Sequence, residues 1–176
     1  MQRTVVVGMG HIGHRHARAY TECEQAQLVA VCDRVEELAR AAGEKFGVPY
    51  FTSAKECYAA MQPDIVSITT GGYEYSSDHY EPTMQAFEAG CNVLGEKPIS
   101  NDLRHATEMV ETAARLGLCY GIDMNHRFTP AARQAKNGRT TAESAASYSA
   151  IWHCGSANSC PSTPFTTISR HSIPIP

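Results

Sequence analysis

Three glycines near the start of the chain have a spacing that suits phosphate binding. They are Gly8, Gly10 and Gly13, which form a G-x-G-x-x-G pattern directly after the apolar run 4–7. Gly10 lets the backbone approach a pyrophosphate, and Gly13 lets the following helix lie close on the strand, so that free N–H groups of the helix face the anion. In this strand-turn-helix context the pattern predicts a dinucleotide-binding loop that includes His11 and Ile12. The alternative is a glycine-rich turn that binds nothing.

An acidic residue follows at the distance that this pattern requires. Asp33 stands roughly 20 residues beyond Gly13, at the end of the apolar run 28–32. A carboxylate there accepts hydrogen bonds from both ribose hydroxyls of an adenosine and repels a 2′-phosphate, which favours NAD over NADP. Arg34 keeps NADP open, because its guanidinium can offset the repulsion and stack on adenine. Otherwise Arg34 is a solvated residue of the first helical turn.

A lysine at position 97 is the candidate for proton transfer. The residues Gly-Glu-Lys-Pro at 95–98 follow a short apolar run, and in a doubly wound sheet the end of that strand lies at the same edge as the glycines. Lys97 is therefore expected to point into the cofactor crevice, where its amine can exchange a proton with a hydroxyl while a hydride moves to nicotinamide. Glu96 is expected to bond the carboxamide edge or to pair with Lys97. The alternative is an exposed Glu-Lys pair in a loop.

Three histidines raise the question of a metal site. His11 and His14 lie one turn apart on the expected helix, and His16 follows them. No cysteine or carboxylate converges with these residues in the sequence, so we expect no metal.

The elements that must position these residues alternate along the chain. Helical patterns cover residues 12–23, 34–46, 54–61, 78–89 and 102–116, and strand patterns cover 4–7, 28–32, 64–69, 92–94 and 118–121. Such alternation predicts right-handed βαβ units. The fold class is therefore α/β, with a Rossmann-like doubly wound parallel sheet. Ser100 and Asn101 are expected to cap the last helix.

Composition limits the remaining possibilities. The 176 residues suffice for one ordinary domain, and the net charge of -3 comes without a basic run, so neither nucleic acid nor an anionic membrane is an expected partner. No apolar stretch approaches the length needed to span a membrane. Seven cysteines without a C-x-x-C pair indicate a reducing, cytoplasmic location. Small molecules and copies of the same chain are the expected partners.

The chain also resembles a known family. The shared features, in family order, are the glycine pattern, Asp33, His79, A-G-C-N-V-L-G-E-K-P at 89–98 and N-H-R-F-T-P at 125–130. In these features the chain is similar to the N-terminal half of the Gfo/Idh/MocA oxidoreductases. The resemblance implies that Lys97 is the catalytic lysine, that Glu96 and His79 line the cofactor crevice, and that Arg127 lies in the loop leading towards the substrate domain.

The resemblance carries further expectations about ligands and assembly. Members oxidise or reduce carbohydrate-like or cyclitol hydroxyls with NAD or NADP, and full-length members are expected to be homo-oligomers. Thr69 and Thr70 end the strand beside the expected nicotinamide ribose. The family often has a compact Pro-Asn turn after them, whereas this chain has Gly-Gly-Tyr-Glu-Tyr at 71–75. Tyr73 and Tyr75 either face the substrate or cover the sheet edge.

The last part of the chain departs from the family. We expect a nucleotide-binding domain at 1–124, the start of a linker helix at 125–136, and an irregular or disordered tail at 137–176 that is rich in Ser, Thr, Ala and Pro. The family's second domain, an antiparallel sheet, is expected to be absent. A shifted reading frame in the tail permits Gly-Arg-Ile-Gly and then Asn-Met-Ala-Leu-Trp, which suits the start of that domain. We hypothesise a frameshift near Lys136; the rival is a genuine divergent tail.

Three functional hypotheses follow. The first is an NAD(P)-dependent oxidoreductase acting on a sugar-like or cyclitol-like hydroxyl or carbonyl, in a truncated chain that binds nucleotide but is inactive alone. The second is a dinucleotide-binding module or subunit without catalysis. The third is a degenerate remnant that misfolds, for which insolubility would be evidence. A neighbouring reading frame with an antiparallel-sheet pattern would favour the first over the second.

Overall fold

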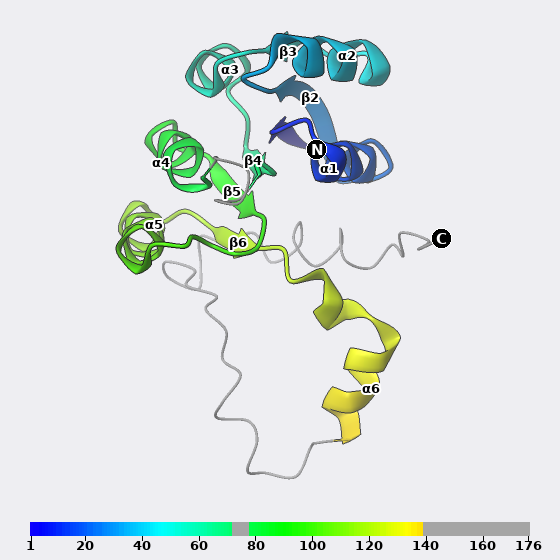
Figure 1. The fold of residues 1–176 in the computed structure, drawn as a ribbon, viewed down its shortest axis with the longest axis vertical. Helices are drawn as coiled ribbons and strands as arrows, with labels where there is room; N and C mark the ends of the chain where they lie inside the picture. Colours follow the sequence, from blue (N-terminus) through cyan, green and yellow to red (C-terminus); the bar gives the residue numbers. More distant parts are fainter. Residues whose placement is uncertain (72–77, 139–176) are drawn as a thin grey trace.

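The strands form one parallel sheet. The computed structural model describes residues 1–71 and 78–138. In that part of the chain six strands lie in the order β3-β2-β1-β4-β5-β6 (Figure 1). Their bounds are β1 Gln2–Val7, β2 Ala26–Cys32, β3 Tyr50–Phe51, β4 Ile65–Ile68, β5 Asn92–Gly95 and β6 Tyr120–Ile122. The expected α/β class with a Rossmann-like doubly wound sheet is confirmed. Residues 139–176, and Tyr73 and Tyr75, lie outside the described residues.

Helices cover both faces of the sheet. The elements are α1 His11–Thr21, α2 Glu36–Phe46, α3 Ala54–Met61, α4 Tyr80–Glu88, α5 Leu103–Leu116, the 3-10 helix η2 Asn125–Phe128 and α6 Pro130–Gly138. In Figure 1, α1 and α2 lie on one side of the sheet, and α3, α4 and α5 lie on the other. Right-handed crossovers place consecutive helices in this way, and the side changes between β3 and β4.

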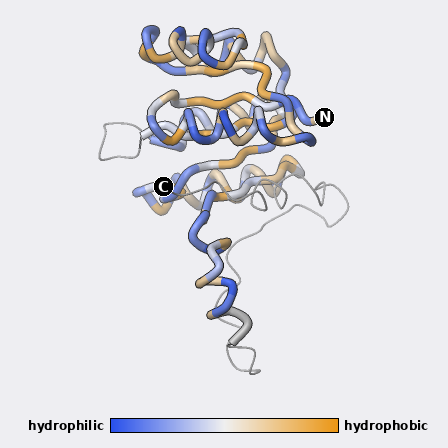
Figure 2. Tube along the Cα trace, turned by 90° about the vertical axis from the view of Figure 1, so that its right-hand side faces the viewer, coloured by the Kyte–Doolittle hydropathy of each residue, from blue (hydrophilic) through white to orange (hydrophobic). Residues whose placement is uncertain are grey.

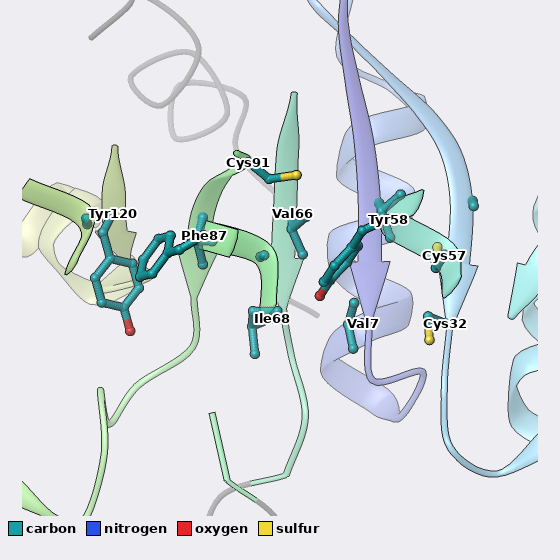
Figure 3. Packing of buried hydrophobic residues seen from close by; sticks show 14 of the residues in the cluster. Val7, Cys32, Cys57, Tyr58, Val66, Ile68, Phe87, Cys91 and Tyr120 are labelled. Atoms are coloured by element: carbon teal, nitrogen blue, oxygen red, sulfur yellow. The ribbon is translucent and has the colours of Figure 1, made fainter. Parts of the chain in front are cut away.

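Each face of the sheet has its own apolar core. On the side of α3, α4 and α5, Tyr58 and Phe87 pack against strand residues such as Val66 and Ile68 (Figure 3). The ring of Phe87 meets the ring of Tyr120 edge to face, with centroids 5.4 Å apart. On the other side, the fully buried Tyr20 of α1 packs with Met9, which follows β1, and with residues of β1, β2 and α2. These cores fix both sets of helices to the sheet.

Helix α6 differs from the rest of the molecule. Figure 1 shows α6 extending away from the sheet, and Figure 2 shows that its described part is largely hydrophilic, whereas apolar residues concentrate in the strands and on the inner faces of the other helices. The residues of η2 that precede it include none that is buried. The sheet therefore holds its core without α6.

Two local details differ from the sequence predictions. Strand β3 was not predicted, because its two residues are too few to show an alternating pattern. It pairs in parallel with β2, where the N–H groups of Val31 and Asp33 donate to the carbonyls of Pro49 and Phe51, each at 3.1 Å. The cap of α5 is Asp102, not the Ser100-Asn101 pair, since the Asp102 carboxylate accepts from the N–H of Arg104 at 2.8 Å. The Ser100 hydroxyl instead accepts from the N–H of Asp102.

Among the described helices, none is both long enough and apolar enough to cross a lipid bilayer.

Candidate functional site

The candidate site lies where the order of the strands reverses. β1 is paired with β2 on one side and with β4 on the other, and both pairings are parallel. Helix α1, which follows β1, lies on one face of the sheet, and α4, which follows β4, lies on the opposite face (Figure 1). In open α/β sheets, ligands bind in the crevice that this divergence leaves outside the carboxyl ends of the strands. Gly8 and Thr69 immediately follow β1 and β4 and so flank this position.

The glycine loop, residues 8–13, contains three glycines with three different environments. Gly8 has a positive φ of 96°, and a Cβ there would lie 2.5 Å from the backbone nitrogen of Thr70. A Cβ on Gly13 would overlap the carbonyl oxygen of Gly8, so helix α1 passes very close to the end of β1. A Cβ on Gly10 would meet nothing within 4 Å. Gly10 therefore faces open space, and the residues present fit a phosphate group placed against this part of the backbone.

Helix α1 begins at the loop without a side-chain cap. Gly10 is its N-cap residue, and no acidic residue occupies the first turn. The first N–H groups of a helix lack partners within the helix, and the positive end of the helix dipole adds to their attraction for anions. His11 and Ile12 are exposed in this first turn. The loop thus offers backbone donors and no negative charge of its own.

Threonines at the end of β4 support the loop. The buried hydroxyl of Thr69 lies 2.7 Å from the carbonyl oxygen of Gly8 and 3.0 Å from that of Val7. Its single proton is shared between these acceptors. Thr70 donates its hydroxyl to the carbonyl of Asp78 at 3.1 Å. Both side chains therefore hold backbone in place around the crevice.

Asp33 lies beside the glycine loop at the end of β2. Its carboxylate accepts from the N–H of Met9 at 2.6 Å and from the N–H of Val35 at 2.9 Å. The side chain is only partly buried, so its remaining lone pairs can accept further hydrogen bonds. Arg34 is exposed next to it. This places one negative and one positive side chain at the same end of the crevice.

The 96–98 turn, formed by Glu96, Lys97 and Pro98, follows β5 on the opposite side of the crevice. The N–H of Glu96 donates to the carbonyl of Ile68 at 3.0 Å, which fixes the start of the turn to the end of β4. The peptide bond between Lys97 and Pro98 is cis. Lys97 is exposed, whereas Glu96 is buried. The side chain of Lys97 is therefore accessible from solvent, whereas that of Glu96 is covered by the surrounding protein.

His79 connects two parts of the site. It is 3% exposed, its Nδ1 lies 2.8 Å from the carbonyl oxygen of Pro98, and its Nε2 lies 3.0 Å from that of Thr70. Carbonyl oxygens only accept, so whichever ring nitrogen carries a proton donates to the carbonyl beside it. The ring thus joins the 96–98 turn to the end of β4, and its polar atoms are engaged by backbone.

A cluster of His16, Glu96 and Asp123 lies behind the turn, and sequence reasoning missed it. The Nε2 atom of His16 lies 3.2 Å from Glu96 Oε1 and 3.5 Å from Asp123 Oδ2, and its Nδ1 lies 2.7 Å from the hydroxyl of Ser67. One ligand-type atom from each of the three residues falls within 4.8 Å of the others. The sequence carries the signal only as three separate polar residues, one within α1, one after β5 and one after β6. The sequence showed no carboxylate converging with His11, His14 or His16, whereas the fold brings Glu96 and Asp123 to His16.

The electrostatics of this cluster centre on the imidazole. Burial lowers the pKa of His16, but hydrogen bonds and charges from Asp123 and Glu96 outweigh it, so the pKa is raised above 6.5. Burial raises the pKa of the neighbouring Tyr20 to about 12, while a contact with Ser67 acts in the opposite direction. The same structure therefore favours a positive charge on His16 and a neutral hydroxyl on Tyr20.

The last of the predicted residues, Arg127, lies in η2 after β6. Its side chain is exposed, and its N–H donates to the carbonyl of Met124 at 2.9 Å. It belongs to the segment that leaves the sheet edge for α6.

Comparisons with known proteins agree with this geometry. Residues 2–124 match the oxidoreductase family that has an NAD-binding Rossmann fold. The chain belongs to the Gfo/Idh/MocA family. The match covers the sheet, the glycine loop and the 96–98 turn of this family member, and it ends just before η2.

Several relatives of known activity cover the same region. The chain is 36% identical over 128 residues to a D-glucoside 3-dehydrogenase of Escherichia coli, which corresponds to 72% of this chain and 35% of the relative. Among solved structures, it superposes with a TM-score of 0.71 and 26% identity on scyllo-inositol dehydrogenase from Lactobacillus casei with bound NAD(H) and scyllo-inositol, covering 78% of this chain and 40% of the other. The chain thus spans about a third of the length of the curated relatives that it matches.

Proposed function

We propose that this chain binds NAD in the crevice between the glycine loop and the 96–98 turn. The observation that carries the proposal is the open space at Gly10, flanked on one side by the N-terminus of α1 and on the other by Asp33. The pyrophosphate would lie against the backbone of the loop, and the adenosine ribose would bond the Asp33 carboxylate. Thr69 and His79 would act from behind, by fixing the backbone that lines the crevice.

Within this proposal NAD is favoured over NADP. A 2′-phosphate would bring at least one negative charge against Asp33, and the carboxylate would lose its ribose hydrogen bonds. Arg34 lies next to this position and is free to offset part of the repulsion. NADP is therefore the weaker ligand but not an incompatible one.

Lys97 is the proposed proton-transfer residue. When bound, NAD would supply the hydride acceptor for oxidation of an alcohol, and we propose that its nicotinamide would lie near the 96–98 turn. The exposed amine of Lys97 would take the proton from the hydroxyl being oxidised and return it in the reverse direction. Glu96, held by its own contacts, would keep the turn in place.

The proposed substrates are sugar-like or cyclitol-like hydroxyls. This proposal comes from the relatives, which include dehydrogenases of D-glucosides, D-apiose and inositol. The described residues near Lys97 come from the nucleotide-binding sheet alone, so we propose that the 176-residue chain binds the dinucleotide but turns over little on its own. Homo-oligomer formation by longer relatives and a cytoplasmic location stay predictions.

Calorimetric titration with NADH tests the proposal. We expect Gly10→Val to abolish binding, because the new side chain would occupy the space assigned to the pyrophosphate while leaving the packed parts of the protein untouched. Lys55→Ala, an exposed position on α3, is the control and should bind like the unchanged protein. Unchanged affinity in Gly10→Val would overturn the assignment of the loop. A panel of sugars and polyols with NAD then separates catalysis from binding alone.

A further inference from the structure

The cluster of His16, Glu96 and Asp123 is not needed for the contacts proposed above, yet it joins the two sides of the crevice. His16 lies in the second turn of α1, a helix whose buried residues pack with β1 and β2. Its ring reaches in the other direction, to Ser67 on β4 and to the residues that follow β5 and β6. The imidazole therefore provides a polar connection from the glycine-loop helix to the half of the sheet that carries Lys97.

Both carboxylates of the cluster are held at fixed positions by backbone bonds. The N–H of Glu96 donates to Ile68 and the N–H of Asp123 donates to Gly95 at 2.8 Å. Glu96 Oε1 faces His16, and Glu96 Oε2 accepts from the N–H of Lys97 at 3.2 Å. One carboxylate thus contacts both the histidine of α1 and the backbone of the proposed catalytic lysine.

The two carboxylates of the cluster need a positive charge or a proton between them. The side chains of His16, Glu96 and Asp123 are 10%, 11% and 26% exposed, so water screens them poorly. Two carboxylates that face one another in such a place repel unless a cation or a proton lies between them. A doubly protonated imidazole satisfies all three contacts, since Nδ1–H donates to the Ser67 hydroxyl and Nε2–H to the carboxylates. Among the described groups, Glu96 and Asp123 are the charges that act on His16, and Tyr20 is a buried neutral neighbour.

We propose that His16 is a positioning residue, a buried imidazolium that ties helix α1 to the 96–98 turn and thereby keeps the glycine loop and Lys97 in register for dinucleotide binding. The proposal deepens the proposed function and rests on it for the effect on affinity. When His16 loses its proton, Glu96 and Asp123 lose their shared cation, and the hydrogen bond from Lys97 to Glu96 is disturbed. Because the link between helix α1 and the 96–98 turn is then weaker, the affinity for the dinucleotide falls as the pH rises.

NMR titration of the histidine rings in the whole 176-residue chain tests the charge directly. We expect the His16 midpoint above 6.5, and we expect Asp123→Asn and Glu96→Gln each to lower it. The backbone amide signal of Lys97 should follow the same midpoint and lose this dependence in His16→Gln. His14 is the internal reference, because burial and nearby Lys45 lower its pKa. A His16 midpoint at or below 6.5, or a Lys97 amide that titrates unchanged in His16→Gln, would overturn the proposal.

NADH titrations at pH 6 and pH 8.5 test the coupling to binding. Affinity should fall by about fivefold or more over this range in the unchanged protein, the usual lower scale of a coupling between sites, and should be independent of pH in His16→Gln. His14→Gln, on the same helix, should keep the pH dependence. If the NADH affinity of His16→Gln still falls as the pH rises, the proposal is wrong. Absence of NADH binding at every pH contradicts the proposed function instead, and the NMR titration still decides the state of His16. A midpoint that moves on addition of EDTA would show a bound divalent cation in place of the proton and would also overturn the proposal.

Discussion

The two sides of the crevice are made in different ways. The glycine loop after β1 depends on close backbone packing, with Gly13 in contact with Gly8 and open space at Gly10. The 96–98 turn after β5 depends on charged and titratable side chains, with Glu96 held between His16 and the N–H of Lys97. The packing of Gly13 on Gly8 involves no titratable group, so it does not depend on pH, but it leaves no room for a side chain at position 13. The contacts of Glu96 depend on the charges of the groups involved, so they respond to pH.

The largest effect should come from Gly13→Val. The first added carbon would overlap the carbonyl oxygen of Gly8, and neither backbone can move without separating α1 from β1. We expect a loss of about 3 kcal/mol or more in the free energy of unfolding, measured by thermal or urea denaturation. Gly10→Val is the matched comparison and should cost only about 1 kcal/mol, through the helix N-cap. Equal losses in the two variants would mean that the loop is not constrained in the way described.

Lys97→Ala tests the 96–98 turn, on the side of the crevice opposite the glycine loop, and should leave the fold intact. In a chimera that continues residues 1–136 with the corresponding part of the D-glucoside 3-dehydrogenase of Escherichia coli, we expect turnover to fall roughly 100-fold, the scale for loss of a positioned acid-base group. NADH affinity, measured in the 176-residue chain as well, should change by less than about threefold, since loop contacts dominate binding. Lys55→Ala is the control. Full turnover in the Lys97 variant would remove this lysine from the proposed chemistry.

Asp33→Ser should alter the choice of cofactor without abolishing binding. Loss of the carboxylate removes the repulsion of a 2′-phosphate and the ribose hydrogen bonds, so the preference for NAD over NADP should shrink by about 1 to 3 kcal/mol. The ratio of dissociation constants for NADH and NADPH measures it. Arg34→Ala should shift the ratio in the other direction. If the unchanged protein prefers NADPH, Arg34 dominates this end of the crevice.

The smallest effect concerns the pH dependence of stability. The folded pKa of His16 is raised because of Asp123 and Glu96 in spite of burial, so its protonation stabilises the fold fully below pH 6.5, and this contribution is lost as the pH rises through the raised value. We expect His16→Gln to lower Tm by roughly a few degrees at pH 6 and by less at pH 8.5. Circular dichroism melts at the two pH values provide the measurement, with His14→Gln as the control. If the Tm difference between the unchanged protein and His16→Gln were larger at pH 8.5 than at pH 6, His16 would not be stabilised as a cation.

Much of the fold was determined by local sequence. The apolar run before Gly8, the glycine spacing and the acid at position 33 predicted the strand, the close helix and a carboxylate beside the glycine loop, because each depends on a short stretch of the chain. The predicted helix 54–61 has the bounds Ala54–Met61 in the structure. Periodicity sufficed wherever an element was long enough to show a face. It failed for β3, whose two residues carry no period.

Only the tertiary structure decided how the charged residues are used. His16 and Glu96 are 80 positions apart, and neither residue type nor spacing indicated that a helix and two strand ends would bring His16, Glu96 and Asp123 together. The sequence predicted that Glu96 bonds the carboxamide edge of the cofactor or pairs with Lys97, and the structure adds a contact with His16 to one with the N–H of Lys97. The physical reason is that a backbone loop is specified by steric limits on consecutive residues. A buried charge cluster is specified by strand order, register and the burial that follows from them.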